Sequence, residues 1–111
     1  MIEAMIRDYL MTVLSVPVYI EVPSEPPSSY VVIERTGGGM DEHIRSAMVA
    51  VQSYGASRLE AATLHEYVLR KLPDIATGSE ISACEVNAEY DYTDTATKRY
   101  RYQAVFDIVY Y

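Results

Sequence analysis

The segment KRYRYQAVFDIVYY, from Lys98 to Tyr111, alternates between two kinds of side chain almost without a break. Aromatic and aliphatic residues occupy the even positions from Tyr100 to Tyr110. A period of two places alternate side chains on opposite faces of a sheet, which predicts a β-strand with one buried face. At ~3.3 Å per residue the strand would reach roughly 40 Å, more than a small domain covers. We therefore expect part of it to contact another chain.

Patterns in the rest of the chain predict two helices and further strands. The apolar residues of 2–14 recur at steps of three and four, which predicts a helix that ends before Pro17. Ser57 and Glu60 have the spacing of a capping box, and the helix that they open is expected to end at Leu72. The other predicted segments are strands at 18–22, 30–36, 43–54 and 80–92, loops at 23–29 and 37–39, and a connection at 93–97.

The order of these segments is α-β-β-β-α-β-β, which we interpret as one α+β domain over residues 1–111. An antiparallel sheet with both helices packed on one face would bury every apolar stripe. The connection at 93–97 is predicted to join the last two strands as a long C-terminal β-hairpin. In the first of these strands, Cys84, Tyr90 and Tyr92 fall on the apolar phase, and the acidic residues are expected to face water.

The C-terminal hairpin is predicted to be longer than the helices that cover the sheet. The second helix would span about 24 Å at ~1.5 Å per residue, against roughly 40 Å for a hairpin strand. We infer that the end of the hairpin projects beyond the helices and contacts another chain. Tyrosine and arginine are favoured in interface cores. The candidate interface residues are Tyr90, Tyr92, Arg99, Tyr100, Arg101 and Tyr102.

The charge balance and the single cysteine narrow the class of protein. The chain has 16 acidic and 9 basic residues and a net charge of −7, which disfavours binding to nucleic acid or to an anionic membrane. Cys84 is the only cysteine, so no intramolecular disulfide forms, as expected in a reducing cytoplasm. The first residues lack the pattern of a signal peptide, and we expect a soluble protein made without an export signal.

No residue pattern predicts catalysis, a metal or a cofactor. The pair His65-Glu66 lacks the second histidine of an H-E-x-x-H site, and His65 is interpreted as a residue at the boundary of the packed face. Cys84 is interpreted as a small buried core residue, because no base is predicted beside it. The run at 37–39 lacks both phosphate-loop patterns and is interpreted as a flexible hairpin loop.

The remaining polar residues have structural interpretations. His43 is predicted to be a surface residue at the start of a strand. The acidic clusters lack the spacing of a calcium loop and are interpreted as solvated charge: Asp41 and Glu42, and Glu89, Asp91 and Asp94. The 11 tyrosines are interpreted as strand and contact residues rather than as a nucleic-acid stacking surface, because few basic residues accompany them.

Several segments together resemble a family. They are YVVIER at 30–35 after a proline-rich loop, MVAVQSY at 48–54, a helix that opens at Ser57, and YRYQAVFDIVY at 100–110. This pattern resembles the tail completion proteins of long-tailed bacteriophages, also called tail terminator or tail-to-head joining proteins. The resemblance covers nearly the whole chain.

The resemblance implies a structural protein of the virion, without enzymatic activity, cofactor or metal. It implies a subunit that forms a ring, typically of six copies, on the head-proximal end of the tail. The implied partners are the major tail tube protein and the head-tail connector, or neck, proteins. DNA would pass through the ring, and the acidic balance agrees with this because a cationic lining would retain phosphates.

Two alternatives remain open at this level. One is another phage neck or head-completion protein of similar size, from an active phage or a prophage. The other is a small-ligand-binding α+β domain, which would require a deep cavity with a few converging polar groups.

Overall fold

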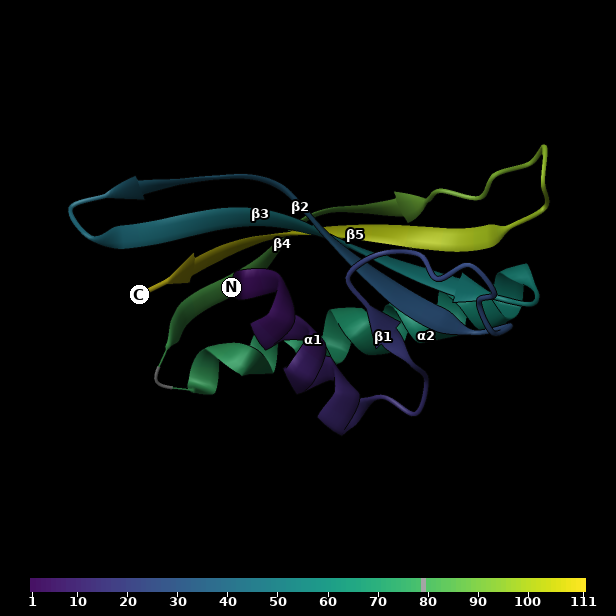
Figure 1. Cartoon of the computed structure of the whole chain (residues 1–111), viewed down its shortest axis with the longest axis horizontal. Coiled ribbons are helices and arrows are strands. Elements are labelled where there is room, and N and C mark those ends of the chain that lie inside the picture. The colour runs from purple at the N-terminus through teal and green to yellow at the C-terminus, as the bar shows by residue number, and fades with distance from the viewer. Residues whose placement is uncertain (79) are drawn as a thin grey trace.

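The computed structural model describes residues 1–78 and 80–111 and confirms the predicted α+β class (Figure 1). The order α-β-β-β-α-β-β is also confirmed, with one 3₁₀ helix added after the second helix. The elements are α1 (Ile2–Val13), β1 (Val18–Tyr19), β2 (Tyr30–Asp41), β3 (Ile44–Gly55), α2 (Arg58–Lys71), η1 (Leu72–Thr77), β4 (Ile81–Asp91) and β5 (Tyr100–Tyr110).

The strands form one five-stranded sheet in the order β1-β2-β3-β5-β4. The pairs from β2 to β4 are antiparallel, as expected, but β1 pairs parallel to β2, so the sheet is mixed. The proline-rich segment at 20–29 is long enough to return the chain to the end of the sheet from which β1 started. The strand expected at 18–22 contains only two residues, because the chain leaves the sheet toward the prolines, which lack an N–H donor.

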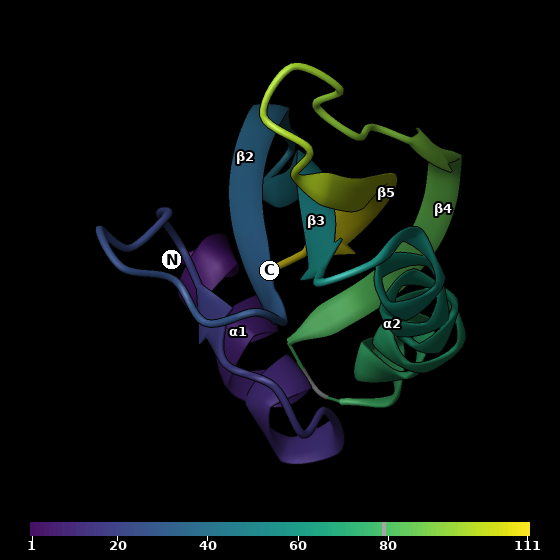
Figure 2. The ribbon, with the colours of Figure 1, turned by 90° about the vertical axis from the view of Figure 1, so that its right-hand side faces the viewer.

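Both helices pack on the same face of the sheet, as predicted (Figure 2). α1 buries Ile2, Ile6 and Leu10, and α2 buries Ala61, His65 and Val68. These residues meet the inward side chains of the strands, of which Phe106 in β5 is fully buried. The capping box also forms: the Ser57 hydroxyl accepts from the Glu60 N–H at 3.1 Å, and the Glu60 carboxylate accepts from the Ala56 N–H at 3.1 Å.

Strand β2 continues through the three glycines that were expected to break it. Its register against β3 shifts between Arg35 and Gly37, so a β-bulge absorbs one residue and the pairing resumes up to Asp41. A Cβ on Gly38 would collide with the backbone oxygen of Ser46 and with the Arg35 guanidinium. Gly38 is therefore required by close packing within a strand, whereas an added Cβ at Gly37 or Gly39 would have room. Because the run belongs to a strand, its interpretation as a flexible loop is wrong.

The actual turn between β2 and β3 is two residues long. Glu42 and His43 join the paired residues Asp41 and Ile44, with φ values of 48° and 72°. Positive φ at both central residues is the signature of the tight turn whose twist matches that of a hairpin. His43 is exposed, but it lies in the turn and not at the start of a strand.

A bulge in β4 reverses the faces in its outer half. The register against β5 shifts first between Ile81 and Ala83 and again, at this bulge, between Val86 and Ala88. An extra residue moves every following side chain to the opposite face. Glu89 therefore contacts His65 of α2, whereas Tyr90 lies on the face of the sheet away from the helices, which we call the open face. The predicted phase of these residues is wrong for this reason.

The molecule is elongated, with principal extents of 44, 25 and 24 Å. The hairpin that extends farthest beyond the helices is β2–β3, at the left of Figure 1. The end of the β4–β5 hairpin lies above the start of α2, where Arg58 forms an ion pair with Asp91 at 3.4 Å. The projection that was predicted for the C-terminal hairpin is therefore wrong, because the end of that hairpin lies over α2, and the hairpin that projects is β2–β3.

Candidate subunit interface

The free end of the β2–β3 hairpin is exposed over residues 34–46, which we call the overhanging hairpin. Its two strands pair with each other up to the turn, so the segment is ordered without support from the helices. Within it the Arg35 side chain folds back, and its Nε donates to the Gly37 carbonyl at 3.2 Å. The segment therefore exposes its side chains to solvent although its strands are paired.

The tip of the overhanging hairpin places apolar and acidic side chains together. Met40 is 67% exposed and Ile44 is 45% exposed, on either side of the turn. Asp41 and Glu42 lie between them and are exposed as well. The pairing of Met40 with Arg45 and of Asp41 with Ile44 puts the two apolar side chains on opposite faces of the hairpin, so each face of the tip carries one of them.

The predicted tyrosine-arginine surface forms in part, on the open face. Arg101 is its centre: the guanidinium carbon lies 4.4 Å from the centroid of the Tyr92 ring. The Arg101 Nε donates to the Tyr92 carbonyl at 2.7 Å, and Nη1 donates to the Tyr54 hydroxyl at 3.0 Å. Tyr90 meets Tyr92 edge to face, with ring centroids 5.9 Å apart. The structure therefore brings together three of the six predicted residues.

A chain of hydrogen bonds connects this cluster across three strands. The Tyr54 hydroxyl donates to Gln52 Oε1 at 3.1 Å, and Gln52 Nε2 donates to Gln103 Oε1 at 2.8 Å. Gln103 Nε2 in turn donates to the Tyr90 hydroxyl at 2.6 Å. These bonds link the buried Tyr54 to the exposed Tyr90 and hold both side chains in place.

The other three predicted residues lie apart from the cluster. The Tyr102 ring packs against the His65 ring at 5.1 Å, on the helix side of the sheet. Tyr100 is half-buried, and Arg99 pairs through its backbone with Asp94 in the connection to β4. Three residues that join the cluster were not among the predicted interface residues: Gln52, Tyr54 and Gln103. Gln52 and Tyr54 share one phase of a predicted strand, but no local signal showed that β3 lies next to β5.

Short-range hydrogen bonds hold the connection between β4 and β5. Asp91 Oδ1 accepts from the Thr93 hydroxyl at 2.6 Å and from the Thr93 N–H at 3.0 Å. These bonds, with a smaller contribution from Arg58, lower the pKa of Asp91. Asp94 Oδ1 accepts from the Ala96 N–H at 3.1 Å, and its pKa is lowered by hydrogen bonds, the largest from Thr97. The acidic residues here shape the connection in addition to carrying charge.

Two sheet edges carry backbone groups without a strand partner among residues 1–78 and 80–111. β1 pairs only with Val31 and Val32, so the outer edge of β2 is open beyond them. β4 forms the other edge along its length. Open edges accept additional strands, although the bulges in both edge strands restrict how far such pairing extends.

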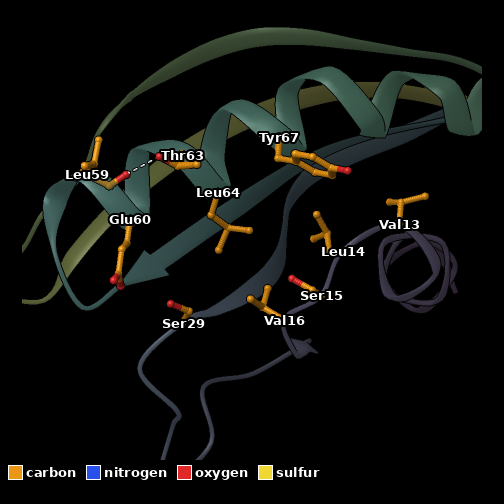
Figure 3. A pocket seen from close by; sticks show the side chains of 10 residues that line it. All are labelled: Val13, Leu14, Ser15, Val16, Ser29, Leu59, Glu60, Thr63, Leu64 and Tyr67. Atoms are coloured by element: carbon orange, nitrogen blue, oxygen red, sulfur yellow. Dashed lines mark hydrogen bonds between the residues drawn. The ribbon is translucent and has the colours of Figure 1, made fainter.

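An apolar groove of about 540 Å³ lies between α2 and the segment that follows α1 (Figure 3). Leu64 points from α2 toward Leu14 and Val16 on the other side, and Tyr67 closes the end near Val13. Two of the polar side chains at the groove already have partners: Thr63 donates to the Leu59 carbonyl at 2.8 Å, and Glu60 accepts from Ala56. The lining residues are Val13, Leu14, Ser15, Val16, Ser29, Leu59, Glu60, Thr63, Leu64 and Tyr67.

The two residues that were considered for catalysis or metal binding, Cys84 and His65, are both buried. Cys84 is 5% exposed, which confirms the predicted core position, and burial raises the pKa of its thiol to about 12. His65 is only 1% exposed and is therefore inside the packed face, not at its boundary. In the described part of the chain, no three His, Cys, Asp or Glu side chains are placed to hold a metal ion. No helix there is long and apolar enough to cross a membrane.

Comparison with known proteins adds no assignment. No protein-family model matches the chain, and no curated protein matches it either.

Proposed function

We propose that the chain is a structural subunit of a phage or prophage virion that caps the tail tube and joins it to the head. It acts by forming a ring with copies of itself, and the ring contacts the tube protein on one side and the neck proteins on the other. Six copies are the number that the family resemblance suggests. The mechanism is surface complementarity, without catalytic turnover.

The observation that carries this proposal is the overhanging hairpin, residues 34–46. Ordered strands that extend past the core of their own subunit expose backbone groups and side chains that make no contact within the monomer. Such exposed surfaces are typical of contacts with another chain. The open edge of β2 and the tyrosine-arginine cluster add two further surfaces of the kind that protein partners use. Together they support an assembly role.

The properties of the groove favour a protein partner over a small ligand. A ligand site has a few polar groups that converge and are free to bind. Here the Glu60 carboxylate accepts from the backbone N–H of Ala56, just before α2, and the Thr63 hydroxyl donates to a backbone carbonyl within α2. Val13, Leu14 and Leu64 in the lining are apolar. An apolar side chain is the better occupant for such a surface.

The role at the tail is tested by electron microscopy of tails assembled with and without this protein. If the protein terminates the tube, tails made without it have uncontrolled lengths, and added protein restores a uniform length. Normal tails that fail to join heads would assign the protein to the neck instead. Normal, head-joined tails would contradict the proposal.

Self-association is tested independently by light scattering of the purified full-length chain over a range of concentrations. We expect oligomers of the purified chain at micromolar to millimolar concentration. On assembled tail tubes, we expect closed rings that are visible by negative stain.

A further inference from the structure

A small cavity of about 230 Å³ lies at the end of the molecule opposite the overhanging hairpin. Its walls come from the proline-rich loop before β2, the end of β3 and the start of β5, which lie in the right half of Figure 1. This cavity is separate from the groove between α1 and α2, because the two share no lining residue.

Two cationic side chains in the lining have no acidic partner. Lys98 and Arg99, which we call the cation pair, are exposed, and neither forms an ion pair within the described chain. The whole chain carries 16 acidic and 9 basic residues, so the charge of this cavity is opposite to that of the molecule as a whole. A local positive charge at a concave site concentrates anions there.

None of the acidic residues in the described segments around the cavity pairs with these cations. Asp91 forms its ion pair with Arg58, and the Glu60 carboxylate accepts from the backbone just before α2. Asp94 Oδ1 accepts from two backbone N–H groups of its own turn, at 3.1 and 3.4 Å. Glu25, beside the prolines, is exposed and makes no ion pair with the described residues. The cation pair therefore keeps its charge for a group from outside the chain.

A buried tyrosine lines the same cavity. Tyr30 is only 3% exposed, and its ring stacks on that of Tyr54 with centroids 4.3 Å apart. The Tyr54 hydroxyl is bonded to Gln52 and Arg101. The Tyr30 hydroxyl, by contrast, has no hydrogen-bond partner among residues 1–78 and 80–111, yet it is not one of the fully enclosed unpartnered groups, so it reaches solvent.

The charges around Tyr30 act on its hydroxyl. Burial raises the pKa of Tyr30, and the nearby Tyr54 adds to this rise, whereas Arg99 and Arg101 lower it. The two guanidinium groups therefore lie close enough to the hydroxyl for their charge to be felt there. A free hydroxyl donor beside cations is a position for an acceptor oxygen with a negative charge.

The backbone at Lys98 is held in a conformation that lysine rarely adopts. Its φ is 56°, in the left-handed region that glycine and asparagine enter at lower cost. Asp94 and Arg99 close the turn beside it with two backbone hydrogen bonds of 3.1 and 3.2 Å. Residues that are kept in such conformations cluster at functional sites. The turn therefore fixes both members of the cation pair at the cavity.

From these observations we propose that the cavity is a binding site for an oxyanion, the phosphate or carboxylate group of a ligand. The cation pair supplies the charge, and the Tyr30 hydroxyl donates a hydrogen bond to one oxygen. The planar guanidinium of Arg99 has the donor geometry that carboxylate and phosphate groups match. The net charge of −7 repels an extended polyanion, so a single compact anionic group is the ligand that fits. This site goes beyond the ring-forming function and does not depend on it.

Two sources supply this chemistry: a free phosphate, and a side-chain carboxylate of a second copy of the chain. Binding is tested by titrating the isotope-labelled full-length chain with inorganic phosphate, and separately with acetate, while the backbone amides are followed by nuclear magnetic resonance. Chloride keeps the ionic strength constant. We expect saturable shifts around Tyr30 and residues 98–100, with a Kd for phosphate of about 1 mM or below, and none from chloride.

Two variants remove one group each and leave the fold intact. Lys98→Gly deletes the ammonium at a φ where glycine fits better, so thermal stability should be equal or higher. Tyr30→Phe deletes the hydroxyl and keeps the stacked ring. We expect each variant to raise the Kd for phosphate about fivefold or more. Arg70→Gln, which removes an exposed cation beside Tyr67, is the control of equal charge and should bind phosphate as the wild type does.

Light scattering of the same variants identifies the source. If phosphate binds and Lys98→Gly self-associates as the wild type does, the ligand is a free anion. If Lys98→Gly also raises the Kd of self-association, and phosphate competes with association of the wild type, the ligand is a carboxylate of a second copy.

Other results would overturn the site. If neither phosphate nor acetate shifts the amides and Lys98→Gly associates normally, the cavity binds no oxyanion, while ring formation stands. If Arg70→Gln weakens phosphate binding as much as Lys98→Gly does, only the net charge matters and the site is wrong as well. If the wild type binds phosphate but stays monomeric, the site stands and ring formation fails.

Discussion

His65 Nε2 of α2 lies 2.8 Å from Oε1 of Glu89 in β4, and this pair joins the helix layer to the edge strand of the sheet. His65 is 1% exposed, and its Nδ1 has no hydrogen-bond partner among the described residues. The imidazole therefore depends on Glu89 for its polar contact. The bulge at Val86 and Ala88 makes this contact available, because without it Glu89 would lie on the open face.

Replacing Glu89 with alanine removes the carboxyl group that forms a hydrogen bond with the buried imidazole of His65. We expect the free energy of unfolding to fall by about 1–3 kcal/mol, the usual penalty for a buried polar group left without a partner. Urea denaturation followed by circular dichroism measures this loss. Glu85→Ala, at an exposed position of the same strand, is the control and should change stability little. Equal effects of the two substitutions would show that the pair does not contribute.

The bonds between Gln52, Gln103 and their tyrosines predict strong coupling in a double-mutant cycle. Replacing Gln52 alone with leucine leaves Gln103 Oε1 without its donor and the Tyr54 hydroxyl without its acceptor, and should lower the free energy of unfolding by about 1–2 kcal/mol. Replacing both glutamines removes donor and acceptor together, so the loss should be smaller than the sum of the single losses. A coupling energy near zero would contradict the hydrogen-bonded chain.

Local signals predicted the elements that depend on local physics. Ser57 and Glu60 form the cap that their spacing predicts, and Phe106 and Ile108 lie on the buried phase of the final strand. The number of strands and their order along the chain follow from the same periodicities. Prolines and capping residues act within a few positions of themselves, so one sequence is enough to interpret them.

The features that escaped prediction depend on contacts between distant segments. The bulge in β4 is a property of its pairing with β5, and it alone exchanges the faces of Glu89 and Tyr90. Gly38 is required by the approach of Ser46, a residue on the neighbouring strand. The groove needs α1 and α2 to be placed next to each other, which no periodicity specifies.

Gly55 is expected to tolerate no side chain. A Cβ at this position would collide with the backbone of Glu60 and Ala61, where α2 starts against the end of β3. Gly55→Ala should therefore lower the free energy of unfolding by about 2 kcal/mol. At Gly39 an added Cβ meets only the Ser46 hydroxyl oxygen, at 3.8 Å, so Gly39→Ala should change stability by less than about 0.5 kcal/mol. Thermal unfolding of both variants checks the contrast.

The connection between β4 and β5 should lose stability in acid. Hydrogen bonds from Thr93, and secondarily Arg58, lower the pKa of Asp91 in the folded chain. A lowered folded-state pKa stabilises the fold above the unfolded value of about 3.9, and this contribution is lost as the pH falls through the folded value. Asp91→Asn should therefore be less stable than the wild type at pH 7, and the difference should shrink below about pH 4. A difference that is constant between pH 7 and pH 3 would contradict this assignment.

The open-face tyrosines are expected to contribute to assembly more than to folding. Tyr90 and Tyr92 are 42% and 43% exposed, and the Tyr90 hydroxyl accepts a hydrogen bond from Gln103. Tyrosine is enriched among the hot spots of interfaces. The double variant Tyr90→Ala with Tyr92→Ala should retain its circular dichroism spectrum but weaken self-association or tail capping about tenfold or more, as measured by light scattering and by tail length in electron micrographs. Val22→Ala, at a loop side chain that is 44% exposed, should change neither measurement. If the double variant associates and caps tails as the wild type does, the tyrosine-arginine cluster is not an interface.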